Sequence, residues 1–199
     1  MRPAALFLAA VVPVLCTAQP LPATALDSVR TYRSLESALK EPDRVYRLDL
    51  SHQRLKEVPE DVRKFPHLNA LDLSRNKLRT LPEWLGAATD LQELRVSRNK
   101  LSEFPQVICG FAHLKRLDLS RNALQGLPEC MGNLAELVSL DLWSNDLAVF
   151  PPELEGMKAL RFLDLRVIQF SAEEMERIKD LLPWAAIHFS QPCNCGETP

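Results

Sequence analysis

Apolar and polar residues alternate in short runs along most of the chain, and each run returns at a fixed interval. With a step of 23 residues, segments that begin at positions 45, 68, 91, 114, 137 and 160 align without an insertion. Their openings read VYRLDLSHQRL, LNALDLSRNKL, LQELRVSRNKL, LKRLDLSRNAL, LVSLDLWSNDL and LRFLDLRVIQF. The central apolar–polar–apolar triplet has period two, as a strand with one buried face requires. The pattern predicts six stacked strands, one in each repeat of residues 45–170.

The apolar positions of these triplets form two rows that we expect to point into a core. The first row is Leu48, Leu71, Leu94, Leu117, Leu140 and Leu163. The second row is Leu50, Leu73, Val96, Leu119, Leu142 and Leu165. One strand and turn cannot bury its own apolar side, so stacked copies are needed for a continuous core. Five repeats continue to an apolar residue and a proline, which fixes φ and lacks an N–H, so we expect the chain to turn there.

This pattern resembles the leucine-rich-repeat family, whose signature is L-x-x-L-x-L-x-x-N-x-L. The resemblance implies an α/β solenoid, a curved right-handed coil with a parallel sheet on its concave face. It also implies a structural ladder in which buried amides bond backbone groups of their own and adjacent loops, formed by Asn76, Asn99, Asn122 and Asn145. Gln53 and Ile168 stand at this position in the first and last repeats, where one neighbour is missing.

Short helices are predicted to cap both ends of the solenoid. The N-terminal segment, residues 19–44, contains Ser34–Leu39, which places three apolar residues on one helical face before Pro42. The C-terminal cap, residues 171–190, opens with Ser171 and Glu174 in capping-box spacing, and Met175, Ile178 and Leu182 follow at helical intervals. Residues 186–189 are expected to add a last strand. The polar residues 191–199 are predicted to be a flexible tail.

The first 18 residues have the order of a signal peptide: a positive start, an apolar run and small residues before Gln19. We therefore expect cleavage after Ala18 and export to the periplasm or the medium. A lipid anchor at Cys16 is the less favoured alternative, because Leu15 is bulkier than lipoprotein signals usually carry at that position. No later stretch is long and apolar enough to predict a stable membrane span.

Cysteine spacing and net charge narrow the classes of function. After removal of the leader, Cys109, Cys130, Cys193 and Cys195 remain, which permits three pairings if all four form disulfides. Their spacing lacks a zinc signature, and the sequence contains no P-loop, G-x-S-x-G or H-E-x-x-H motif, so we expect neither a cofactor nor a metal. The formal net charge of −2 argues against a nucleic-acid partner, since such proteins usually carry a basic excess.

The outward strand positions supply the candidate binding residues. One row is aspartate except at Arg95, and its carboxylates are interpreted as part of the repeat rather than as a glycosidase pair or calcium site. A second row carries Arg75, Arg98 and Arg121, which either pair with the aspartates or read anions with their guanidinium forks. Trp143 breaks a row of serines, and tryptophan and arginine are enriched in binding hot spots. With Arg116 on the neighbouring strand, these residues predict a binding surface whose most positive point is the middle of the sheet.

The sequence thus predicts a non-catalytic module that binds a protein partner outside the cytoplasm, through the concave face of its sheet. Two alternatives remain open. If the leader is not cleaved, the chain is an intracellular scaffold or a regulator of small GTPases. If the aspartate row acts chemically, it is a carbohydrate-processing enzyme.

Overall fold

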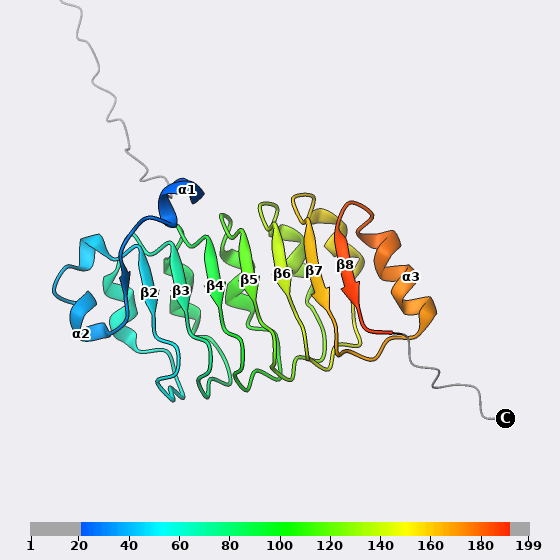
Figure 1. The fold of residues 1–199 in the computed structure, drawn as a ribbon, viewed down its shortest axis with the longest axis horizontal. Helices are drawn as coiled ribbons and strands as arrows, with labels where there is room; N and C mark the ends of the chain where they lie inside the picture. Colours follow the sequence, from blue (N-terminus) through cyan, green and yellow to red (C-terminus); the bar gives the residue numbers. More distant parts are fainter. Residues whose placement is uncertain (1–20, 192–199) are drawn as a thin grey trace, which may run out of the picture.

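A computed structural model describes residues 21–191, which form a row of stacked coils (Figure 1). The predicted signal peptide with Cys16 lies outside these residues, as do Cys193 and Cys195 in the predicted tail. Within residues 21–191, no helix has the length and apolar character needed to cross a membrane.

Eight parallel strands form one sheet in which the spatial order follows the order of the chain. The strands are β1 (Thr31–Tyr32), β2 (Arg47–Asp49), β3 (Ala70–Asp72), β4 (Glu93–Arg95), β5 (Arg116–Asp118), β6 (Ser139–Asp141), β7 (Phe162–Leu165) and β8 (Ala186–Phe189). Strands β2 to β7 pair with a shift of 23 residues, so that Leu48 lies opposite Leu71 and Leu71 opposite Leu94. The six predicted repeat strands are therefore confirmed, and β8 is the expected last strand. Strand β1, which extends the sheet at its other end, was not predicted.

Short 3-10 helices carry the chain back on the other side of the core (Figure 1). They are η1 (Pro42–Arg44), η2 (Glu60–Lys64), η3 (Glu83–Ala87), η4 (Gln106–Gly110), η5 (Glu129–Asn133) and η6 (Pro152–Gly156). The repeated proline stands in extended conformation immediately before each of η2 to η6, where its missing N–H leaves no unpaired donor. All twelve residues of the two predicted core rows are at most 2% exposed. Burial of each such side chain contributes about 1.5–3 kcal/mol to folding.

The asparagine ladder connects neighbouring coils through the backbone. Each side-chain oxygen accepts the N–H of a residue one coil earlier, from Leu55 to Asn76 at 2.9 Å up to Leu124 to Asn145 at 3.1 Å. Each amide nitrogen donates to a carbonyl of its own coil and to one of the coil before, as Asn122 does to Leu119 and Val96 at 2.9 and 3.0 Å. This exchange removes the cost of burying a polar side chain.

Both predicted capping helices are present. Helix α2 (Leu35–Ala38) begins after Ser34, whose hydroxyl accepts the Ser37 N–H. Helix α3 (Ala172–Leu181) opens with the expected capping box, in which Ser171 and Glu174 satisfy one another's backbone N–H groups. Met175 and Ile178 are buried against the last coil.

A second N-terminal helix, α1 (Ala23–Leu26), was not predicted. It packs beside the N-terminal ends of the central strands (Figure 1), and Leu26 is only 1% exposed there. The side chain of Gln92 donates to the Leu21 carbonyl at 2.6 Å, and Arg47 donates to the Leu26 carbonyl at 3.1 Å. Since α1 has only four residues, it is held by these contacts rather than by helix propensity.

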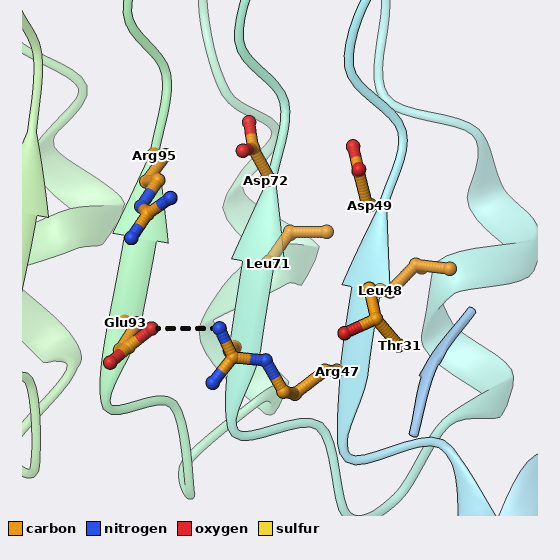
Figure 2. Close-up of a pocket in the computed structure, with 9 residues that line it drawn as sticks. Thr31, Arg47, Leu48, Asp49, Leu71, Asp72, Glu93 and Arg95 are labelled. Carbon is orange, nitrogen blue, oxygen red and sulfur yellow. Dashed lines mark hydrogen bonds and ion pairs between the residues drawn. The ribbon is translucent and has the colours of Figure 1, made fainter. Parts of the chain in front are cut away.

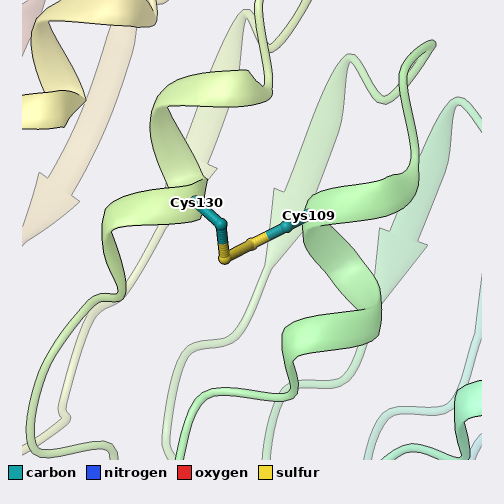
Figure 3. The surroundings of a disulfide bond; sticks show 2 residues. All are labelled: Cys109 and Cys130. Carbon is teal, nitrogen blue, oxygen red and sulfur yellow. A yellow bond between two sulfur atoms is a disulfide. The ribbon is translucent and has the colours of Figure 1, made fainter.

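A disulfide joins two adjacent coils on the side away from the sheet. Cys109 lies in η4 and Cys130 in η5, and Figure 3 shows their sulfur atoms joined between the two helical turns. The bond closes a segment of 21 residues. The sequence had left this pairing open among three.

Candidate binding surface

Outward side chains cover one face of the sheet, the open face, which corresponds to the predicted concave face. In each coil, three side chains point outward: those of the first and third residues of the strand and that of the residue two positions after the third. In the coil of β6 these are Ser139, Asp141 and Trp143. Parallel pairing brings equivalent residues side by side, so that Asp72 lies between Asp49 and Arg95. The face is thus a set of rows, each taking one residue from every coil.

The aspartate row shapes the turn that follows each strand. Asp49, Asp72, Asp118, Asp141 and Asp164 each accept the backbone N–H of the residue two positions later, at 2.8–3.1 Å. These bonds favour the structural interpretation of the carboxylates over a catalytic or calcium-binding one. Among the described residues, no three His, Cys, Asp or Glu side chains gather closely enough to hold a metal ion.

The two carboxyl groups at the C-terminal end of the aspartate row differ in acidity. Desolvation and the neighbouring Asp118 and Asp164 raise the pKa of Asp141, against the hydrogen bond from the Trp143 N–H. Desolvation also acts on Asp164, but hydrogen bonds from Arg166 outweigh it and lower its pKa. Stabilisation from Asp164 is therefore complete above the carboxyl pKa of the unfolded chain. It is lost as the pH falls through the lower folded value.

The residue three positions after each member of the aspartate row has a left-handed backbone conformation. His52, Arg75, Arg98, Arg121, Ser144 and Val167 have φ between 54° and 63°. Non-glycine residues adopt this conformation infrequently, so the sheet-to-loop turn imposes it at every coil. The S-R-N that follows β3, β4 and β5 was a signal that could have predicted this turn.

The three arginines of this row are exposed to solvent at one edge of the open face. The ion pairs with the aspartate row, one of the two predicted arrangements, do not form. Within residues 21–191, the aspartates of that row pair instead with Arg33, at Asp49, and with Arg166, at Asp164. Desolvation and repulsion from Arg121 and Arg75 lower the pKa of Arg98. The arginines therefore stand as a stripe of like charges.

Trp143 lies at the end of this stripe. The guanidinium carbon of Arg121 stands 4.1 Å from its ring centroid, in a cation–π contact. Arg166, at the equivalent position of the next coil, binds Asp164. Trp143 remains partly exposed, and so presents an aromatic surface beside charged groups.

In the middle of the sheet, a buried glutamate binds two arginines, of which Arg116 belongs to the predicted positive region. The Glu93 side chain is 8% exposed and binds Arg116 at 2.6 Å and Arg47 at 3.4 Å. Figure 2 shows Arg47 reaching from β2 past β3 to Glu93 on β4. The small side chain of Ala70 on β3 leaves room for this bridge and for a hollow of about 110 Å³. Arg47, Glu93 and Arg116 occupy equivalent positions of their strands, and their opposite charges were the signal in the sequence for this pairing.

The six predicted binding residues therefore fall into separate environments. Arg75 and Arg98 are free of ion pairs in the described part of the chain, and Arg121 covers Trp143. Arg95 is exposed beside the hollow, between the aspartates of the adjacent strands. Arg116 is engaged with Glu93. The structure thus brings Arg121 and Trp143 into contact, and it places Arg116 in a different network.

Residues 44–183 match the family described as leucine-rich repeat region. A comparison with curated proteins returned no match. Among solved structures, a leucine-rich-repeat protein of Leptospira interrogans has 30% sequence identity and a TM-score of 0.64. The match covers 82% of this chain and 49% of that protein, so the chain spans about half its length.

Two further structures extend the similarity. Internalin C2 of Listeria monocytogenes has 21% identity and a TM-score of 0.63, over 76% of this chain and 64% of its own. The ectodomain of the Arabidopsis thaliana receptor kinase GASSHO1/SCHENGEN3 has 28% identity and a TM-score of 0.58, over 73% of this chain and 18% of its own. That ectodomain was solved in complex with Casparian strip integrity factor 2.

Proposed function

Because the chain belongs to the leucine-rich-repeat family, we propose that it is a recognition module that binds a protein partner on the open face of its sheet. The fold favours a binding role, since stacked coils create an extended surface without an enclosed site. The plant receptor ectodomain, which is similar over 73% of this chain, is seen with a bound factor.

The observation that carries the proposal is the Arg121–Trp143 pair. The tryptophan has no partner in the core, yet the cation–π contact fixes its ring at the surface. A rigid, partly exposed aromatic ring loses little conformational freedom on binding, and such residues often supply most of the affinity of an interface. The aspartates beside it are occupied by backbone N–H groups, which favours a binding role over a catalytic one.

Trp143→Ala is expected to weaken binding of the protein partner roughly thirtyfold, since hot-spot truncations cost about 2 kcal/mol or more. The matched control is Trp84→Ala. Trp84 also lies under an arginine, Arg63 at 5.9 Å, but it belongs to η3 on the other side of the core.

The measurement is a pull-down from the native envelope or medium with wild type and both variants as baits, followed by titration of the captured protein. The partner should be retained by wild type and Trp84→Ala and lost from Trp143→Ala. Equal retention by all three folded baits would place the interface elsewhere on the solenoid.

We further propose that the protein acts outside the cytoplasm. The predicted leader in residues 1–18 is the first support for this location. The Cys109–Cys130 disulfide is the second, because disulfides persist in oxidising compartments and are rare in the cytosol.

The intact mass of the exported protein is expected to correspond to a chain that begins at Gln19. It should be measured before and after reduction and alkylation, so that Cys109 and Cys130 take up alkyl groups only after reduction. A mature protein that retains Met1 would rule out cleavage of the leader. Free thiols at Cys109 and Cys130 in the protein from its native compartment would remove the second support.

A further inference from the structure

The loops that follow strands β2 to β4 carry a second line of positive charge beside the arginine stripe. Two tracks run across the coils: Arg75, Arg98 and Arg121 form one, and Arg54, Lys77 and Lys100 form the other. We call these six residues the basic edge. All six are exposed.

The basic edge lacks internal counter-charges. None of its six residues forms an ion pair with another residue between 21 and 191. The acidic residues of the same loops, Glu57 and Glu103, make no such pair either. At the opposite ends of the strands the charges do pair, through Glu93 with Arg47 and Arg116. Among the described residues, the arginines and lysines of the basic edge are thus without ion pairs, in contrast to Arg47 and Arg116 at the opposite ends of the strands.

The sequence changes character where the basic edge ends. At the two equivalent positions of the next coils, Ser144 and Asp146 and then Val167 and Gln169 replace the basic residues. Trp143 stands at this boundary, with Arg121 over its ring. The positive surface therefore crosses only the first four repeats and ends beside an aromatic group.

We propose that the basic edge binds an extended acidic peptide segment, which lies across the coils and belongs to the protein partner. This proposal rests on the proposed function in one respect, which is that the bound segment belongs to a protein partner. Guanidinium forks match carboxylates, and equivalent positions in parallel strands recur about every 4.8 Å, so one extended segment meets several coils.

Other polyanions fit this edge less well. Successive bases stack on several aromatic side chains, whereas the aromatic residue that stands at the end of the edge is Trp143, and Arg121 already lies over its ring. Amphipathic surfaces that insert into a membrane present exposed apolar residues among their charges, whereas Leu78 and Leu101 in these loops are 0% exposed. A peptide requires neither feature.

The test measures fluorescence anisotropy of a labelled ten-residue peptide of alternating glutamate and glycine. Lys77→Gln/Lys100→Gln is expected to weaken its binding about tenfold at low salt, because exposed charge pairs contribute modestly and add along the edge. Lys40→Gln/Lys115→Gln changes the net charge equally at other places and should bind as wild type does. Arg98→Asn should also weaken binding, since asparagine tolerates the left-handed backbone and removes only the charge.

Equal weakening by both double variants would overturn the proposal, because net charge alone would then account for binding. Absence of peptide binding by the wild type would also overturn it. So would tighter binding of a heparin oligosaccharide of equal charge or of vesicles containing anionic lipid. Neither lysine of the Lys77→Gln/Lys100→Gln variant belongs to the Arg121–Trp143 pair, so this variant tests the edge without changing that pair. The edge and the open-face interface are therefore tested independently.

Discussion

A chain that lacks residues 171–190 is expected to aggregate or to lose its cooperative melting transition. Helix α3 covers the open end of the core with Met175 and Ile178, and Phe170 of the last coil packs edge-on against Phe189 of β8. Removal of the cap exposes this apolar surface and leaves β7 as an unpaired strand edge. Both features promote association between chains.

The cap is also tested by a single substitution that keeps the chain complete. Ile178 is 1% exposed, so Ile178→Ala should lower the free energy of unfolding by about 2–5 kcal/mol. Arg177→Ala, on the exposed side of the same helix, should change it by less than about 0.5 kcal/mol. The measurements are denaturant unfolding of both variants and light scattering of the truncated chain. A monomeric truncation with an unchanged melting curve would contradict the capping role.

The sequence was sufficient to predict the features that repeat. The period of 23 residues was enough to predict β2 to β7, both core rows and the asparagine ladder. Equivalent residues have equivalent surroundings in each coil, and the same sequence pattern therefore recurs in several repeats. The capping box of α3 was also readable, since Ser171 and Glu174 act within one turn. Local and periodic interactions leave clear traces in a sequence.

Features that join distant segments could not be predicted in this way. Helix α1 depends on Gln92 and Arg47, which lie far along the chain from Leu21 and Leu26. The sequence placed Arg116 with the other arginines, but its role depends on the buried Glu93 of the neighbouring strand. An outward strand position shows that a side chain lies outside the core, but it does not tell whether that side chain is exposed or which charges find partners.

The asparagine ladder leads to the second large effect, because its side chains replace backbone partners that water cannot reach. Asn145 is 4% exposed and accepts the Leu124 N–H, while its amide donates to the carbonyls of Leu119 and Leu142 at 3.1 and 2.8 Å. Asn145→Ala removes all three bonds and creates no new partner for these groups. Each buried group left unpaired costs about 1–3 kcal/mol, so the free energy of unfolding should fall by about 3–5 kcal/mol.

Two further variants separate the ladder from the volume of the side chain. Gln53→Ala changes the equivalent position of the first coil, where the side chain is exposed and reaches only the Arg33 carbonyl at 3.5 Å, so stability should change by less than about 0.5 kcal/mol. Asn145→Asp keeps the acceptor for Leu124 but directs a buried carboxylate at two carbonyl oxygens, which raises its pKa. This variant should therefore melt well below wild type at neutral pH, and the difference should narrow as the pH falls and the carboxyl group takes up a proton. Denaturant and thermal unfolding at several pH values measure these effects. If Asn145→Ala unfolded at the same denaturant concentration as Gln53→Ala, the coils would be held by their leucines alone, without a contribution from the ladder.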